Sequence, residues 1–171
     1  SKETNGSALL REAQFKVQSI ISNSGMISTN DLVEEYEKDN IHPKNKTDVG
    51  KRLAYMALSR TYGFKGMEDM GPVYKSMEVK YGAAILSFDH AKDGFNRLKG
   101  MEGFEIAGED KVFYPAEAEV YNNLQIKVKS DKVKTPVAVR YCFRDFKPGN
   151  VANLRELPMY PSRPATSESH R

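Results

Sequence analysis

Residues 77–88 read MEVKYGAAILSF, in which Met77, Val79 and Tyr81 occupy alternate positions, as do Ala84, Leu86 and Phe88. Met77 and Val79 alternate with charged residues, and Leu86 and Phe88 follow on a shared face. A period of two is typical of a strand with one buried face, whereas an amphipathic helix repeats every three or four residues. The stretch therefore predicts β-structure in this part of the chain.

The same period continues through most of the chain after Gly66. Further alternating runs occupy residues 104–106, 124–128 and 137–144, and turn sequences such as Lys92-Asp93-Gly94 and Tyr121-Asn122-Asn123 separate them. Several short strands joined by turns are typical of an antiparallel β-sandwich. We therefore expect a β-sandwich domain over residues 67–163. Residues 164–171, PATSESHR, are small and polar, and we expect a disordered tail there.

Before residue 64 the periodicity is helical. Residues 7–21 carry Leu10, Val17 and Ile20 at spacings of three and seven, which predicts a helix with one apolar face. Ser7 is the expected N-cap, because a serine hydroxyl can accept a hydrogen bond from a free backbone N–H in the first turn.

A second helix is predicted over residues 46–62, preceded by Asn45 and with Asp48 in the position that completes a capping box. Between the helices, residues 26–33 alternate loosely and predict a short strand. This order favours an α/β layer. One strand and two helices make an incomplete layer, so we expect its apolar faces to be partly exposed and residues 1–66 to be less ordered than the sandwich.

Composition excludes several function classes. The 171 residues carry 26 Lys and Arg against 23 Asp and Glu, without a basic block, so a nucleic-acid partner is not expected. The sequence contains no apolar run of about 18 residues, so a membrane span is not expected. Cys142 is the single cysteine, the three histidines are scattered, and no glycine-rich phosphate loop is present, so neither a metal nor a cofactor is expected.

One short motif suggests chemistry: Asp39-Asn40-Ile41-His42-Pro43. A histidine acts as general base at neutral pH when one ring nitrogen is free and a carboxylate orients the other. Asp39 lies three positions before His42, which is close enough for a loop to bring the two side chains together. The alternative is a solvated polar loop, because the D-x-x-H pattern is short and common. Ser7 and Cys142 are both poor candidates for a nucleophile, as an N-cap and a strand residue.

The wider sequence resembles the sialate O-acetylesterase family of the SGNH (GDSL-like) hydrolase superfamily. The resemblance covers nearly the whole chain in order. It is carried by LREAQ at 10–14, GMISTNDL at 25–32, DNIHPKNKTDVGKRLAYMALSRTYG at 39–63, GPVYKSMEVKYG at 71–82, GFEIAGEDKVFYPAEAEV at 103–120 and PVAVRYCFRDFKPGN at 136–150. It implies that residues 1–66 form the C-terminal end of an SGNH-like esterase domain, with the last strand and helices of an α/β/α fold.

The resemblance also implies a function and a site. In such enzymes a serine attacks an O-acetyl ester on sialic acid or a related acetylated glycan. On this sequence His42 becomes the base, Asp39 its orienting partner, and Asp31 a weaker rival for that role. The serine and oxyanion segments of the superfamily lie N-terminal to everything in this chain. We therefore expect the chain alone to be inactive, with the missing N-terminal catalytic segment as a partner, in an extracytoplasmic full-length protein.

A second hypothesis is a non-catalytic β-sandwich module that binds carbohydrate or packs on a partner domain. A pure binding module has no use for the motif of Asp39 and His42, so the motif favours the esterase hypothesis.

Overall fold

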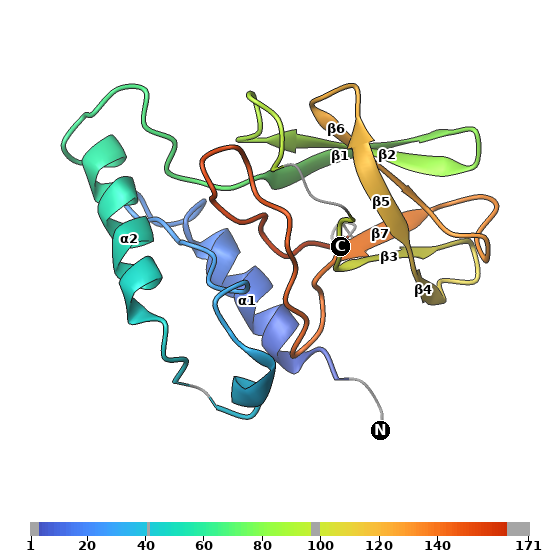
Figure 1. The fold of residues 1–171 in the computed structure, drawn as a ribbon, viewed down its shortest axis with the longest axis horizontal. Helices are drawn as coiled ribbons and strands as arrows, with labels where there is room; N and C mark the ends of the chain where they lie inside the picture. Colours follow the sequence, from blue (N-terminus) through green and yellow to red (C-terminus); the bar gives the residue numbers. More distant parts are fainter. Residues whose placement is uncertain (1–3, 41, 97–99, 164–171) are drawn as a thin grey trace.

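The computed structural model describes residues 4–40, 42–96 and 100–163, so the predicted tail at 164–171 lies outside the described residues. Within these described residues, two helices, a short 3-10 helix and seven strands follow one another (Figure 1). No helix of the described part is long and apolar enough to cross a membrane. The elements are α1 (Gly6–Val17), η1 (Glu35–Glu37), α2 (Lys46–Arg60), β1 (Val73–Lys80), β2 (Ala83–Asp89), β3 (Phe104–Ala107), β4 (Phe113–Pro115), β5 (Glu117–Tyr121), β6 (Gln125–Lys129) and β7 (Ala138–Tyr141).

The strands form two antiparallel sheets, with the orders β1-β2-β6-β5 and β4-β3-β7. The stretch 77–88 supplies the hairpin of β1 and β2, in which Met77 lies opposite Leu86. The predicted sandwich-like arrangement of short antiparallel strands is therefore confirmed. The boundary placed at residue 66 remains a prediction.

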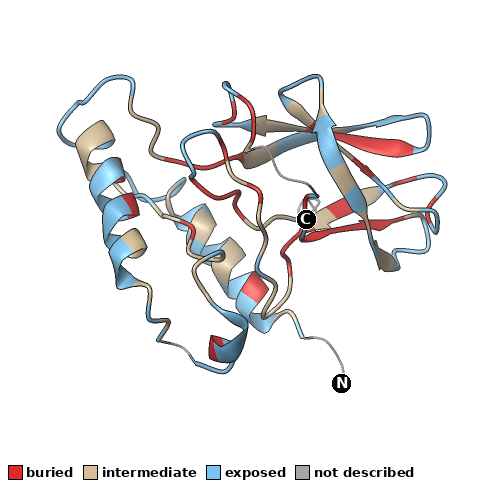
Figure 2. Cartoon of the chain, viewed as in Figure 1, coloured by how far each residue is buried: buried red, intermediate tan, exposed pale blue. Residues whose placement is uncertain are grey.

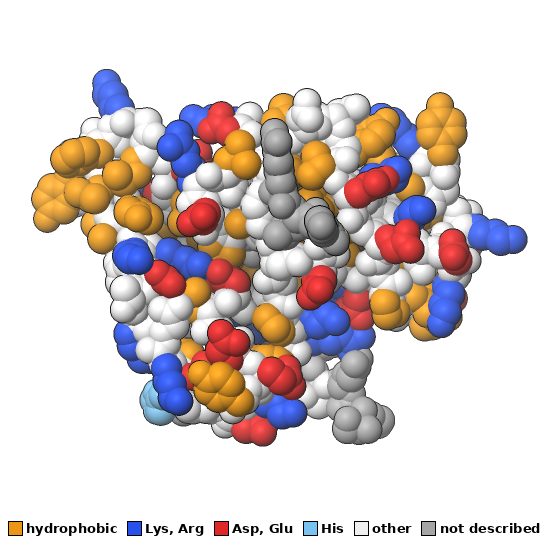
Figure 3. Space-filling view, in the orientation of Figure 1, with side chains coloured by type: hydrophobic (Ala, Val, Ile, Leu, Met, Phe, Trp, Pro, Cys, Tyr) orange, Lys and Arg blue, Asp and Glu red, His pale blue; other side chains and the backbone are white. Residues whose placement is uncertain are grey.

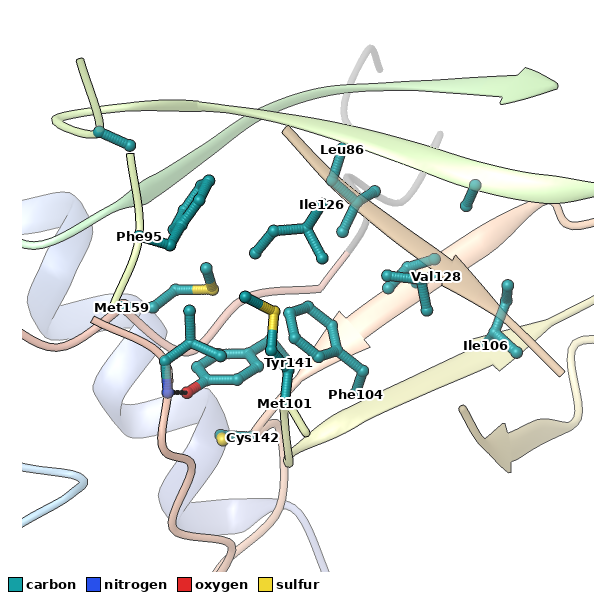
Figure 4. Close-up of a cluster of buried hydrophobic side chains, with 14 of the residues drawn as sticks. Leu86, Phe95, Met101, Phe104, Ile106, Ile126, Val128, Tyr141, Cys142 and Met159 are labelled. Atoms are coloured by element: carbon teal, nitrogen blue, oxygen red, sulfur yellow. Dashed lines mark hydrogen bonds between the residues drawn. The ribbon is translucent and has the colours of Figure 1, made fainter. Parts of the chain in front are cut away.

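The main hydrophobic core lies between the two sheets (Figure 4). Leu86 and Ile126 from one sheet meet Phe104 and Tyr141 from the other, all of them almost fully buried. Within this core the backbone N–H of Val151 donates to the Tyr141 hydroxyl over 3.2 Å. Burial differs between the two parts of the chain (Figure 2). Buried residues concentrate in the sheets and in the C-terminal segment (residues 143–163), whereas the helices are mostly exposed or intermediate.

Two strands, β4 and β5, were not predicted. The chain passes from one sheet to the other between them at Ala116, whose backbone N–H donates to the Phe104 carbonyl over 3.2 Å. Strand β4 has only three residues, which is too short to display a period, and β5 follows it after a single residue. The predicted turn at Asn122-Asn123 is confirmed, because both residues adopt positive φ and join β5 to β6.

The first helix differs from its prediction at both ends. It begins after Asn5, not at Ser7, and it ends at Val17 and not at residue 21. The backbone N–H of Ser7 donates to Asp145 Oδ1 over 2.7 Å. A carboxylate from the C-terminal segment therefore accepts from a free N–H of the first turn, in place of a capping side chain of the helix itself.

The apolar face predicted over residues 7–21 is exposed, as expected for an incomplete α/β layer. Leu10 is 59% exposed, Val17 41% and Ile20 79%. The opposite face packs inward, with Ala8 buried and Phe15 in ring contact with Tyr160 at 4.9 Å. Contacts to the C-terminal segment therefore select the buried face, and the apolar face is left uncovered in this chain.

The strand predicted over residues 26–33 does not form: residues 26–29 have no strand pairing, and a turn follows in which the backbone N–H of Leu32 donates to the Thr29 carbonyl over 3.1 Å. A strand requires a neighbour, and no described strand lies beside this segment. Side chains bond to two of its carbonyl groups instead. The Met26 carbonyl accepts from the Tyr160 hydroxyl over 2.5 Å, and the Ser28 carbonyl accepts from Arg52 over 2.7 Å.

Candidate functional site

The candidate site is the loop between η1 and α2, residues 38–45. Helix α2 begins directly after it, and its first turn is capped as predicted. The Asn45 side chain accepts a hydrogen bond from the backbone N–H of Asp48 over 3.1 Å. The end of the loop is thereby fixed to the helix.

His42 and Asp39 are both exposed in this loop. The backbone N–H of His42 donates to Asn40 Oδ1 over 2.9 Å, which fixes the backbone of the loop near its tip. Among the described residues, no hydrogen bond or ion pair joins the His42 ring to Asp39 or to any other side chain. The ring is therefore open to a group from outside the described chain. Ile41 lies outside the described residues.

Asp31, the rival for the orienting role, is held elsewhere. Both of its carboxylate oxygens accept from the Arg52 guanidinium, over 2.7 and 2.6 Å. Arg52 is buried, and its Nη1 also donates to the Ser28 carbonyl. The pair is a bidentate ion pair that joins the unpaired segment 26–33 to α2.

Glu37 is a residue of this loop region that the sequence analysis missed. It is only 3% exposed, whereas its neighbours Glu35 and Tyr36 are exposed. One carboxylate oxygen accepts from the backbone N–H of Lys44 over 3.0 Å, and the other from that of Glu34 over 3.3 Å. The sequence offers one weak signal, the spacing of three between Glu34 and Glu37, which is the spacing of a capping box.

Neither rejected nucleophile gains support from the structure. Burial raises the pKa of the Cys142 thiol from 9.0 to about 12, so the thiolate is not populated at neutral pH. Ser7 lies in the first turn of α1, with its backbone N–H bonded to Asp145. Among the described residues, no serine hydroxyl is hydrogen-bonded to His42.

One cluster has the composition of a metal site. Ligand atoms of Glu68, Asp69 and His90 lie within 4.8 Å of one another. Each group already has a partner in the chain, because Arg60 pairs with Asp69, and His90 Nδ1 lies 3.2 Å from Glu68 Oε1. These pairs account for the cluster without a metal ion.

Comparison with solved structures finds similarity to a known enzyme. The structure is similar to the crystal structure of a carbohydrate acetylesterase from Xanthomonas citri, with a TM-score of 0.82 and 36% sequence identity. The match covers 93% of this chain but only 36% of the esterase chain, so this chain spans about a third of its length. No protein-family model matches the sequence, and no curated protein matches it. The chain thus resembles part of a carbohydrate acetylesterase.

Proposed function

We propose that this chain is the C-terminal part of a carbohydrate O-acetylesterase and supplies the acid–base histidine, His42, to a serine that lies outside the chain. One observation carries the proposal: nearly the whole chain matches part of a carbohydrate acetylesterase at 36% identity. The chain spans only about a third of that enzyme, and we assign the remaining catalytic groups to a segment outside this chain.

The proposed reaction is acyl transfer in two steps. His42 takes the proton of the serine hydroxyl as its oxygen attacks the acetyl carbonyl carbon. The imidazolium then gives this proton to the sugar oxygen as the ester C–O bond breaks. Water repeats the sequence on the acetyl-serine and releases acetate. The exposed His42 ring has no partner among the described residues, so it is accessible to a serine from another segment.

Asp39 is the proposed orienting carboxylate. Among the described residues no hydrogen bond or ion pair joins it to His42, and hydrogen bonds of catalytic groups often tighten only in the assembled, substrate-bound state. Asp31 is less suited to the role because Arg52 occupies both of its oxygens.

The proposed substrate is O-acetylated sialic acid or a related acetylated glycan, and the proposed location of the full-length protein is extracytoplasmic. Both follow from the family resemblance of the sequence. The matched enzyme is a carbohydrate acetylesterase, which supports an acetylated sugar as the class of substrate.

The exposed apolar surface supports a docked catalytic segment. Leu9, Leu10, Val17, Ile20 and Ile21 of α1 and its following turn are all more than 40% exposed. On the face shown in Figure 3, hydrophobic side chains also gather near the C-terminal end of α2, where Tyr62 is 71% exposed and Phe64 57%. An apolar surface of this kind marks an interaction site. The occupant that we assign to it is the serine-bearing part of the esterase domain.

A chimeric enzyme tests the proposal. The matched third of the Xanthomonas citri esterase is replaced with this chain, and hydrolysis of 4-nitrophenyl acetate is measured beside the isolated chain. We expect turnover by the chimera, no turnover by the isolated chain, and loss of turnover with His42→Ala. A folded but inactive chimera would favour the non-catalytic binding module. Turnover by the isolated chain that depends on His42 would place the nucleophile inside this chain.

A further inference from the structure

Glu37 is the buried carboxylate of an otherwise exposed region. Of the described residues from Glu34 to Lys44, it is the one that is fully buried, and its side chain is withdrawn from water. A buried charge lowers stability unless its oxygens are hydrogen-bonded. The burial of the Glu37 carboxylate therefore depends on the backbone N–H groups that donate to it.

These groups lie on both sides of the His42 loop. The N–H of Lys44, at 3.0 Å, is seven residues after Glu37, and the N–H of Glu34, at 3.3 Å, is three residues before it. Capping of the short helix η1 requires only the Glu34 bond. The Lys44 bond spans the whole segment from Asp39 to Pro43 and joins its two ends.

Two further bonds continue from this closure to His42. The backbone N–H of Asn40 donates to the Glu37 carbonyl over 2.7 Å, and Asn40 Oδ1 accepts from the backbone N–H of His42 over 2.9 Å. On the other side, Pro43 fixes one backbone dihedral between His42 and Lys44. The backbone of His42 is thus connected to Glu37 in both directions along the chain.

We infer that Glu37 is a positioning residue for His42. Its carboxylate accepts from the amides of Glu34 and Lys44, closes the loop, and so fixes the backbone position from which the imidazole projects. The inference rests on the proposed function, because it assigns the closure a purpose in acid–base chemistry. A displacement of a catalytic group by about 1 Å lowers turnover by about 100-fold. Loss of the closure therefore reduces kcat and leaves substrate binding unchanged.

The test uses three variants in the chimeric esterase and in the isolated chain. Glu37→Ala removes both acceptors, and Glu37→Gln keeps the side-chain size and one oxygen acceptor. Glu35→Ala is the matched control, because Glu35 belongs to the same short helix and has a side chain that is 77% exposed and paired only with Lys38. Amide hydrogen exchange at Lys44 and Glu34 reports the closure, and kcat and KM report its effect on the reaction.

We expect Glu37→Ala to accelerate exchange at both amides and to lower kcat by about 10- to 100-fold with KM unchanged. Glu37→Gln should recover part of both losses, and Glu35→Ala should match the parent. Accelerated exchange with an unchanged kcat overturns the positioning role, and unchanged exchange overturns the closure itself. A parental chimera that is folded but inactive overturns the proposed function, and with it any catalytic purpose of the closure, while the exchange data still decide whether Glu37 fixes the loop.

Discussion

Arg52 donates to both carboxylate oxygens of Asp31, at 2.7 and 2.6 Å, and so joins α2 to the unpaired segment that precedes the His42 loop. The Arg52 side chain is 10% exposed and that of Asp31 27%. A bidentate pair with this little solvent contact is geometrically specific. It gives Asp31 a structural role in the part of the chain that carries His42.

Asp31→Asn should therefore destabilise the chain. The substitution preserves shape but removes the charge opposite a buried guanidinium, at a cost of about 2 kcal/mol. Urea unfolding measures this as a lower midpoint with an unchanged slope. Asp39→Asn is the control for stability, because Asp39 is exposed and has no side-chain partner among the described residues. Equal midpoints for the two variants would contradict the structural role of Asp31.

Tyr160 joins the helical part to the rest of the chain, and its substitution should separate two kinds of contact. Its ring packs with Met56 and Met70, and its hydroxyl donates to the Met26 carbonyl. Tyr160→Phe removes only the hydrogen bond and should cost about 1 kcal/mol. Tyr160→Ala also removes the ring and should cost about 3–5 kcal/mol. Similar unfolding midpoints for the two variants would show that the ring contributes little.

Alkaline pH should destabilise the chain because it contains a buried thiol and two buried tyrosine hydroxyls. Burial raises the pKa of Cys142 from 9.0 to about 12 and that of Tyr160 from 10.0 to about 12, and burial raises the pKa of Tyr141 well above 10.0. The unfolded chain loses each proton first. Each contribution is therefore fully present below the unfolded pKa and is lost as pH rises toward the folded pKa.

The unfolding free energy should thus begin to fall near pH 9, because the thiol is the first of these three groups to ionise in the unfolded chain. It should fall more steeply from about pH 10, where the tyrosine hydroxyls of the unfolded chain also ionise. Each group contributes a slope of about 1.4 kcal/mol per pH unit. Cys142→Ala should remove the slope between these two pH values, and Tyr160→Phe should preserve it. A parent chain with constant stability across this range would contradict the burial of the thiol.

The exposed apolar surface of α1 and of the turn that follows it should tolerate charge. Ile20→Lys replaces a side chain that is 79% exposed, so unfolding free energy should change by less than about 0.5 kcal/mol. Ala8→Leu on the opposite, buried face should cost about 1–3 kcal/mol through overpacking. Light scattering should show less self-association for Ile20→Lys than for the parent. Marked unfolding of the lysine variant would mean that this face is covered within the chain.

The strands could be predicted where a period of two was long enough to read. Met77 and Leu86 belong to such runs, and they pair in the β1–β2 hairpin. Strands β4 and β5 were missed because the chain changes sheets at Ala116 after only three residues of β4. The predicted strand at 26–33 was wrong because alternation reports a face but not the presence of a neighbour to pair with.

Contacts between segments far apart in sequence explain the inward face of α1. Ser7 bonds to Asp145 and Phe15 packs against Tyr160, and both partners are more than 130 residues away in sequence. Periodicity within residues 7–21 contains no information about such partners. Glu37 was missed for a different reason: its partners are only three and seven residues away, but a glutamate in a polar loop is ordinarily solvated. The roles of His42 and Asp39 remain predictions from the motif and the resemblance.

The most direct test of the central claim locates the serine that His42 activates. The chimeric esterase is treated with a fluorophosphonate, which labels serines activated by a base, and mass spectrometry maps the adduct. We predict an adduct on a serine of the Xanthomonas citri segment, formed at least about 100-fold more slowly after His42→Ala. An adduct on a serine of this chain, or an equal labelling rate without His42, would contradict the claim.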